Sequence, residues 1–195
     1  LSLWLFDRHG ADPTEITGAF ANPRNACPCP NGSRLAFVAE VAGVAQVASL
    51  ELSSGAIKIL TSLPQGVSGV PAWSPDGTTI AVTARRPGAS DSRGPYRSSH
   101  GTLAHEGVGV IERALQDLYL VDVASGAARR ATSGDQVNED PRWSPAGGRI
   151  LFRASFPPDR EWREDPSLWV LDVHTGERRE VVSDWGAVVG AGGRR

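Results

Sequence analysis

The stretch Val70–Ala84, VPAWSPDGTTIAVTA, decides the fold. Its centre, Ser74–Gly77, is typical of a tight turn, because proline presets φ at the first corner, aspartate bonds its own backbone and glycine takes the left-handed position. The residues Thr79–Thr83 are β-branched and partly alternating, which predicts a half-buried strand. Trp73 adds a large apolar side chain just before the turn.

The same turn-and-strand unit recurs twice. A close copy lies at Pro141–Ala154, PRWSPAGGRILFRA, with tryptophan, serine, proline and glycine in the same places. A worn copy lies at Pro28–Ala39, PCPNGSRLAFVA, in which Pro28 replaces the tryptophan.

A second motif alternates with the first. It is a strand that ends in an acid, a turn that contains glycine, and a return strand. Two full copies are Leu118–Thr132, LYLVDVASGAARRAT, and Leu168–Val182, LWVLDVHTGERREVV, and looser copies surround Asp7 and Glu51. The alternation of the two motifs indicates an internal repeat.

The spacing of the two motifs is nearly constant. The proline of the next turn follows the acid by 23, 24 and 23 residues (Asp7 to Pro30, Glu51 to Pro75, Asp122 to Pro145). The acids lie 44 residues apart in the first interval, and insertions stretch the next two intervals to 71 and 50. Repeats of this length, built from short strands, are typical of β-propeller blades. The sequence therefore predicts an all-β fold, a partial β-propeller of about three four-stranded antiparallel blades and a half blade.

The repeat also divides the chain. Three blades in a row make an open arc, so we expect its two ends to contact further blades or another chain. No charged-then-apolar leader opens the sequence. The expected units are a closing hairpin (residues 1–17), three blades (21–61, 69–132 and 139–182), an insert within the second blade (86–116), and a linker or the start of a next blade (183–195).

The composition is that of a globular domain, with 195 residues, 40% of them hydrophobic, and a formal charge of −2. This balance gives no reason to expect nucleic acid or a membrane as a partner. Lys58 is the one lysine beside abundant arginine, which we attribute to a GC-rich bacterial genome.

Cys27 and Cys29 flank one proline, at a Cα separation of about 6–7 Å in an extended chain, at or beyond the disulfide limit. No cluster of Cys or His follows that would bind a metal. We therefore expect two unpaired thiols in a reducing, cytoplasmic compartment, and neither a metal nor a cofactor.

Catalytic motifs are missing from the sequence. It contains no GxSxG elbow, no GxxxxGK[ST] loop, no GxGxxG that opens a helix and no HExxH. The recurring acids Asp7, Glu51, Asp122 and Asp172 stand at hairpin entrances, where a carboxylate accepts hydrogen bonds from turn N–H groups, so we interpret them as structural. We predict that this chain alone hydrolyses nothing.

The insert, Arg86–Gln116, is the one part that the repeat does not explain. A loop this long in a compact domain is usually functional or disordered, so a substrate-facing or partner-facing loop and a solvated excursion both stay open. Residues 104–115 favour a turn or two of helix, weakened by Gly107 and Gly109. The candidate residues for contact with a substrate or a partner are Tyr96, Arg97, Glu106, Glu112 and Arg113.

The WSPDG turn, its strand and the hairpin LYLVDVASG together resemble the TolB-type, WD40-like propeller repeat. The segment Gly94–Gly126 is similar to the N-terminal propeller of prolyl-oligopeptidase-family serine peptidases, in the acylaminoacyl-peptidase-like branch, which carry a Pro-Tyr-Arg-like segment and an insert before such a strand. This resemblance implies a seven-bladed propeller that caps the active site of an α/β-hydrolase domain and admits short or unfolded peptides. Nothing in this sequence matches that second domain, so no catalytic residue carries over. The TolB resemblance implies an alternative, a propeller that binds protein partners without a hydrolase domain.

Overall fold

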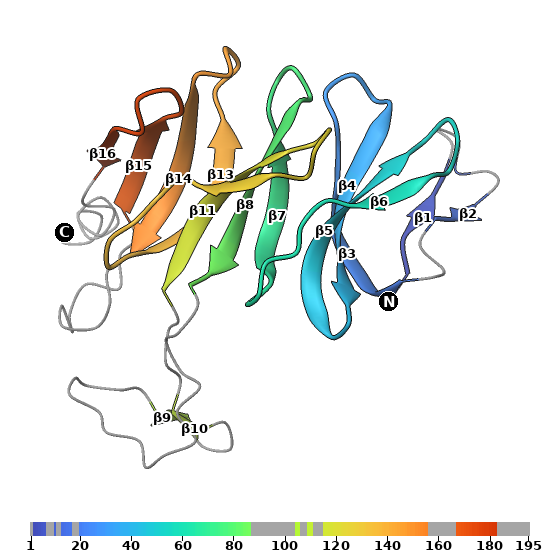
Figure 1. The fold of residues 1–195 in the computed structure, drawn as a ribbon, viewed down its shortest axis with the longest axis horizontal. Coiled ribbons are helices and arrows are strands. Elements are labelled where there is room, and N and C mark those ends of the chain that lie inside the picture. Colours follow the sequence, from blue (N-terminus) through green and yellow to red (C-terminus); the bar gives the residue numbers. More distant parts are fainter. Residues whose placement is uncertain are drawn as a thin grey trace, which may run out of the picture.

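The computed structural model describes residues 2–6, 10, 13–16, 20–86, 104–105, 109–110, 115–155 and 167–182. All regular structure in these residues is β-strand, and the sheets stand side by side in a row (Figure 1). No helix that could cross a membrane occurs in this part of the chain. The strands are β1 (Trp4–Leu5), β2 (Thr14–Glu15), β3 (Ala21–Pro28), β4 (Arg34–Val41), β5 (Val44–Glu51), β6 (Ile57–Ile59), β7 (Val67–Trp73), β8 (Thr79–Arg85), β9 (Ala104–His105), β10 (Gly109–Val110), β11 (Gln116–Asp122), β12 (Ala128–Arg130), β13 (Val137–Trp143), β14 (Arg149–Ser155), β15 (Ser167–Asp172) and β16 (Arg178–Val182).

The first blade is the four-stranded antiparallel sheet β3-β4-β5-β6. Its central strands are joined by a two-residue turn, because Val41 pairs with Val44. Both turn residues, Ala42 and Gly43, have positive φ, 51° and 79°. This backbone matches the twist of the flanking strands, as in the favoured hairpin turns.

The second blade consists of β7, β8, β11 and β12, and the third of β13 to β16. Neighbouring strands within each blade are antiparallel. One parallel pairing, Gln116 with Val137, connects the second blade to the third. The predicted all-β propeller architecture is therefore confirmed at the level of its sheets.

The three predicted turns share one geometry. The glycines Gly32, Gly77 and Gly147 have φ of 71°, 70° and 76°. Each donates its N–H to the carbonyl of the residue three places earlier, at 2.9 Å. Glycine is favoured here because side chains with a Cβ rarely adopt this φ.

Apolar layers fill the spaces between neighbouring sheets. The layer between the first and second blades includes Val38 and Val47 opposite Trp73 and Val121. The layer between the second and third blades sets Leu118 and Leu120 against Phe152, among others. A third layer joins the outer face of the first blade to the β1–β2 hairpin, through Phe37, Leu50, Leu3 and Ile16.

The first strands of successive blades lie next to one another, since β7 contacts both β3 and β13. We call these the inner strands, and the last strands, β6, β12 and β16, the outer strands. Every inner strand has an irregular register before its last residues, between Arg24 and Cys27, Ser68 and Ala72, and Glu139 and Arg142.

Candidate functional site

The residues predicted to contact substrate fall outside the described part of the chain. They are Tyr96, Arg97, Glu106, Glu112 and Arg113.

Ala104–His105 and Gly109–Val110, within the insert, form strands rather than helix. β9 and β10 pair antiparallel, His105 with Gly109 and Ala104 with Val110. The helical turn expected over residues 104–115 is therefore wrong at these positions. Closely spaced glycines favour a chain reversal over a helix, which explains the difference.

The insert leaves and re-enters the second blade at one point. β8 and β11 stay paired as far as Arg85 with Gln116. One residue further out, the N–H of Arg86 donates to the carbonyl of Leu115 at 2.9 Å. Both ends of the insert are thus fixed by main-chain hydrogen bonds to a rigid sheet.

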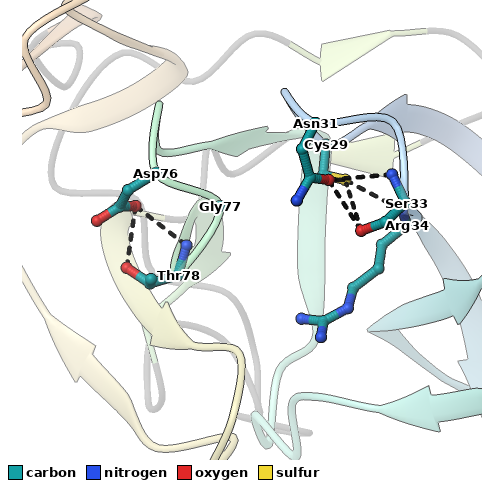
Figure 2. Close-up of a pocket in the computed structure, with 7 residues that line it drawn as sticks. All are labelled: Cys29, Asn31, Ser33, Arg34, Asp76, Gly77 and Thr78. Carbon is teal, nitrogen blue, oxygen red and sulfur yellow. Dashed lines mark hydrogen bonds between the residues drawn. The ribbon is translucent and has the colours of Figure 1, made fainter.

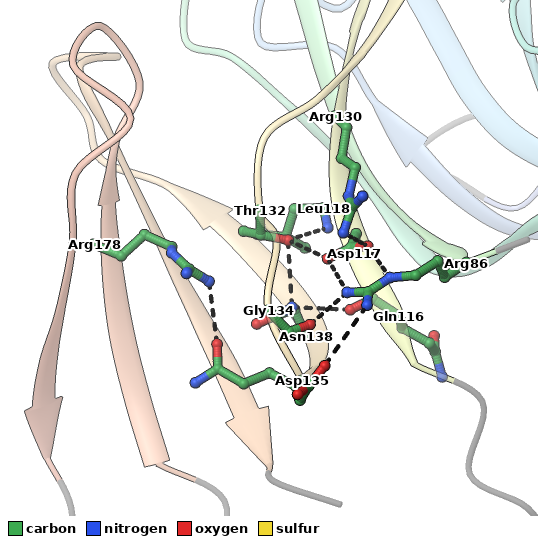
Figure 3. Close-up of polar contacts among 11 residues, drawn as sticks. Arg86, Gln116, Asp117, Leu118, Arg130, Thr132, Gly134, Asp135, Asn138 and Arg178 are labelled. Carbon is green, nitrogen blue, oxygen red and sulfur yellow. Dashed lines mark hydrogen bonds and ion pairs between the residues drawn. The ribbon is translucent and has the colours of Figure 1, made fainter. Parts of the chain in front are cut away.

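A buried carboxylate, that of Asp117, lies directly beside this base (Figure 3). Its side chain is 0% exposed, while those of Arg86 and Arg130 are 23% and 39% exposed. Arg86 spans the carboxylate, with Nε 3.1 Å from Oδ2 and Nη2 3.4 Å from Oδ1. Nη2 of Arg130 lies 2.8 Å from Oδ2, and the Thr132 hydroxyl donates to Oδ1 at 3.1 Å. The buried charge is therefore paired and hydrogen-bonded, as a charge out of water must be.

The network extends into the loop that leads to the third blade. Arg86 also donates to the carbonyl of Gly134. The amide of Asn138 donates to the carbonyl of Gln116 at 2.9 Å and to the Thr132 hydroxyl at 3.3 Å. Arg86, at the start of the insert, is thereby tied both to the second blade and to the loop that leads to the third.

The first blade contains an uncharged counterpart of this network. Gln46 and Thr61 stand 15 residues apart, as Asp117 and Thr132 do. The Thr61 hydroxyl donates to Gln46 Oε1 at 2.7 Å, and Gln46 bonds the Leu63 backbone at 3.0 and 2.8 Å. Asp117 belongs to no sequence motif. The sequence signal that indicates it is the 15-residue spacing to a threonine, which Gln46 and Thr61 repeat in the first blade. The first blade has an amide at this position and the third has a serine, Ser167, so the carboxylate and its two arginines are particular to the blade with the insert.

The chemistry of the cluster suits support rather than catalysis. Guanidinium groups do not act as bases at neutral pH. Among the side chains that the structure describes, the one imidazole is that of His174, which is exposed in a turn. No group of three potential metal ligands occurs among the described residues. What the cluster can do is to hold the base of the insert in one geometry.

A hollow of about 240 Å³ lies between the turns of the first and second blades (Figure 2). Arg34 bonds Glu51 across the sheet, and the other polar side chains bond within their own turns. The thiol of Cys29 and the hydroxyl of Ser33 both donate to Asn31 Oδ1 at 2.8 Å. The Thr78 N–H donates to Asp76 Oδ1 at 3.0 Å. Because these groups are satisfied locally, the hollow offers no evident ligand site. It is lined by Cys29, Asn31, Ser33, Arg34, Asp76, Gly77 and Thr78.

Both cysteines are unpaired, as predicted. Burial raises the pKa of the Cys29 thiol, but hydrogen bonds from the Arg34 N–H and the Ser33 hydroxyl outweigh it, so that the pKa lies below its ordinary value. Burial raises the pKa of Cys27, and the opposing charge of Arg142 does not reverse this. Neither thiol lies beside a described histidine or a metal cluster.

Two of the four recurring acids, Asp122 and Asp172, accept hydrogen bonds from their hairpin turns, as predicted. Asp122 Oδ1 accepts hydrogen bonds from the Ser125 hydroxyl and N–H, at 2.6 and 2.7 Å. Asp172 Oδ1 accepts from the N–H groups of Thr175 and His174, both at 3.0 Å. These bonds hold the pKa of both carboxyls below the usual range.

The other two acids differ. Glu51 bonds mainly across the sheet, to Arg34 Nε at 3.0 Å. Asp7 lies outside the described residues.

No family model matches the sequence. Two curated proteins do. The chain is 29% identical over 166 residues to the uncharacterized peptidase YuxL of Bacillus subtilis, an alignment that covers 80% of this chain and 25% of that protein. It is 30% identical over 172 residues to a protein TolB homolog of Chlorobium luteolum, which covers 76% of this chain and 36% of that protein. The chain thus spans about a quarter and about a third of the relatives that it matches.

Solved structures share the fold. An acylaminoacyl peptidase in complex with a peptidyl chloromethyl ketone has a TM-score of 0.65 at 9% identity, over 94% of this chain and 28% of that one. The β-propeller domain of the trilobed protease from Pyrococcus furiosus has a TM-score of 0.55 at 13% identity, over 86% of this chain and 44% of that one. The chain therefore has a β-propeller fold, and its resemblance to both TolB-type and peptidase propellers is confirmed.

Proposed function

We propose that this chain is the non-catalytic propeller portion of a prolyl-oligopeptidase-family serine peptidase, in which it caps the active site and gates the access of peptides. The observation that supports this proposal is the fixed geometry at the base of the insert. Main-chain hydrogen bonds hold both ends of the insert to the sheet, and a buried carboxylate with two arginines lies beside them. Binding loops are typically attached to a rigid scaffold in this way. The match to a peptidase relative supports the same class.

In this proposal the partner of the propeller is an α/β-hydrolase domain, and the ligand is a peptide. Arg97 or Arg113 binds a substrate carboxylate, Glu106 or Glu112 binds an amino terminus, and Tyr96 packs beside them. The free thiols of Cys27 and Cys29 favour a cytoplasmic location. The hydrolysis itself belongs to the other domain, because it needs a base-activated nucleophile beside an oxyanion hole.

A second candidate function rests on the match to a TolB homolog. In it the propeller is an interaction module that binds a protein partner, and the insert is the contact surface. The two candidates differ in one property of the parent protein. A GxSxG elbow in a hydrolase domain downstream of this chain favours the peptidase, and a parent protein without a hydrolase domain favours the module.

The test replaces residues 94–113, in the intact parent protein, with a short Gly-Ser linker. We expect the protein to fold, since β8 and β11 pair directly with each other up to the base of the insert. We expect kcat/KM for peptides to change about tenfold or more, equivalent to ~1.4 kcal/mol. A control with a Gly-Ser linker of the same length as the removed segment separates loop chemistry from loop length. Unchanged kcat/KM across peptide lengths contradicts the substrate-binding role.

The activity of the chain by itself is a separate test. Incubated alone with aminoacyl and peptide esters, it should give background rates. Turnover that is lost when a serine of this chain is mutated contradicts the proposal.

A further inference from the structure

The first blade shows what the position of Asp117 needs for folding. There the side chain of Gln46 accepts from the Thr61 hydroxyl at 2.7 Å and from the Leu63 N–H at 3.0 Å. It also donates to the Leu63 carbonyl at 2.8 Å. One neutral side chain therefore joins the third strand of that blade to the loop that leads to the next blade.

In the second blade, two charged residues share this work. Asp117 Oδ1 accepts from the Thr132 hydroxyl, as Gln46 accepts from the threonine of the first blade. Arg86 donates to the carbonyl of Gly134, two residues after Thr132, as Gln46 donates to the matching carbonyl in its own loop. The pair Arg86–Asp117 thus makes the contacts that Gln46 makes alone.

Arg130 has no part in this structural role. Its Nη2 lies 2.8 Å from Asp117 Oδ2, an oxygen that Arg86 Nε already contacts at 3.1 Å (Figure 3). The residue at the same distance after the hairpin acid is Ile59 in the first blade and Glu180 in the third, so neither has a cation there. The second guanidinium is therefore more than the blade fold requires.

The cluster carries more positive than negative charge. The guanidinium groups of Arg86 and Arg130 both contact the one carboxylate of Asp117. A second acid, Asp135, lies 4.0 Å from Arg86 Nη1, but its side chain is 87% exposed, so that water screens its charge. The excess positive charge favours the binding of an anion.

Arg130 keeps hydrogen-bond donors for such an anion. Its side chain is 39% exposed, and its Nε and Nη1 make no hydrogen bond to another described residue. A guanidinium presents its N–H groups as a planar fork that matches the oxygens of a carboxylate. The contact with Asp117 fixes this fork in advance, which lowers the entropy cost of binding.

The three charged side chains lie on one face of the second blade, at the base of the insert. Arg130 pairs directly with Tyr119, which stands two residues after Asp117 in the same strand. Asp117 pairs with Ala84, which stands two residues before Arg86. Directly paired residues share a face, and so do alternate residues of one strand. The surplus guanidinium therefore lies where the insert joins the sheet.

We propose that Arg130 binds a carboxylate of the ligand at the base of the insert. This inference rests on the proposed function, in which the ligand is a peptide, and it adds a fixed partner for the carboxylate assigned there to Arg97 or Arg113. Asp117 is a positioning residue that holds the guanidinium, and Arg86 keeps Asp117 paired. A peptide offers a carboxylate at its C-terminus and on acidic side chains, and the experiment separates these two sources.

The test follows peptide binding to the full chain by NMR. The first probe, acetyl-Ala-Gln-Ala, has a free C-terminal carboxylate. The second, acetyl-Ala-Glu-Ala amide, has a carboxylate on its side chain only, and the control peptide, acetyl-Ala-Gln-Ala amide, has none. We expect saturable shifts of the Arg130 Nε–H and of the backbone amides of residues 129–132 with a carboxylate probe, and none with the control peptide. A response to the first probe assigns the C-terminus, and a response to the second assigns an acidic side chain.

Variants link the shifts to one side chain. Arg130→Gln removes the charge and should raise the dissociation constant of the binding probe about tenfold or more, read from the backbone amides. Arg130→Lys keeps a charge beside Asp117 for folding but lacks the fork, so it should weaken binding as well. The matched control is Arg85→Gln, because Arg85 is exposed and lies next to Arg86 on the opposite face of the strand. It should leave the dissociation constant unchanged.

The inference and the proposed function can fail separately. No saturable shift with either carboxylate probe would overturn the inference, whatever the parent protein does. So would equal shifts with the control peptide, or a dissociation constant that Arg130→Gln leaves unchanged. A parent protein without peptidase activity contradicts the proposed function, and the carboxylate site is then judged by the NMR result alone.

Discussion

Cys29 takes the place in the first turn that Ser74 takes in the second. Cys29 Sγ accepts the N–H of Arg34 at 3.0 Å, as Ser74 Oγ accepts the N–H of Thr79 at 3.0 Å. Each side chain also donates to the residue two places on, Asn31 or Asp76. The thiol is therefore a turn-capping group, and the N–H of Arg34 that it accepts is one of the hydrogen bonds that hold its pKa below the ordinary value.

The first prediction concerns this cap. Cys29→Ser should retain the free energy of unfolding, because serine makes the same two bonds in the second turn. Cys29→Ala should lose about 1 kcal/mol, because the Arg34 N–H loses its acceptor. Urea unfolding measures both. Cys27→Ala is the control, since its thiol makes only a long contact of 3.8 Å to Pro28. Equal stability of the Ser and Ala variants of Cys29 would argue against a capping role.

The second prediction separates two tryptophans that pack in one apolar layer. Trp143→Phe removes the hydrogen bond to the Ala72 carbonyl and should cost about 1 kcal/mol beyond the loss of ring area. Trp169 Nε1 is buried without a partner among the described residues, so Trp169→Phe should cost less or stabilise the chain. Thermal or urea unfolding compares the pair. A larger loss at Trp169 than at Trp143 refutes the role given to the indole bond.

The third prediction concerns the buried carboxylate. Asp117→Ala leaves Arg86 and Arg130 without their partner and should lower the free energy of unfolding by about 3 kcal/mol. This is the low end for the loss of a buried ion pair, because both arginines are partly exposed to water. Asp117→Gln should cost less, because glutamine can bond Thr132 as Gln46 bonds Thr61.

The mirror substitution, Gln46→Glu, is the matched test of that explanation. It places a charge where the first blade has only Thr61 and the Leu63 backbone as described partners. It should therefore destabilise the chain more than Asp117→Gln, as measured by urea unfolding. The reverse order would show that the two sites are not equivalent.

The fourth prediction is a pH dependence. Hydrogen bonds to the folded carboxylates keep the pKa of Asp122 and Asp172 below the ordinary value. Their contribution to stability is thus fully present above the pKa of unfolded aspartate, and is lost as the pH falls through the lower, folded pKa, between about pH 5 and pH 2. The urea midpoint should fall over this range, and less steeply in Asp172→Asn. The same pH slope in Asp172→Asn as in the original chain would contradict the role given to these hydrogen bonds.

The sequence predicts the parts of this fold that local chemistry determines. The Ser74–Gly77 turn and the hairpin acid Asp122 can be predicted because their side chains make hydrogen bonds within a few residues of themselves. The cluster at the base of the insert cannot be predicted in this way. Arg86 and Asp117 are 31 residues apart, and Arg86 and Gly134 are 48 apart, so only the folded sheet brings them together. The helix expected over residues 104–115 is wrong at the described positions 104–105 and 109–110, because propensity alone does not settle a segment with two glycines.

The indole N–H of Trp73 donates to the Cys27 carbonyl and that of Trp143 to the Ala72 carbonyl, and these two bonds bear on how the sequence can change over evolution. Each acceptor is a main-chain carbonyl, which every amino acid provides, so the identity of the acceptor residue is free to drift. Cysteine, alanine and arginine indeed occupy the three equivalent positions 27, 72 and 142. The donor has no such freedom, because removal of the indole ends the contact, as at Pro28. We therefore expect the acceptor positions to vary in sequence and the tryptophan positions to stay constant. Repeats of this kind can diverge in sequence while neighbouring blades keep the same packing.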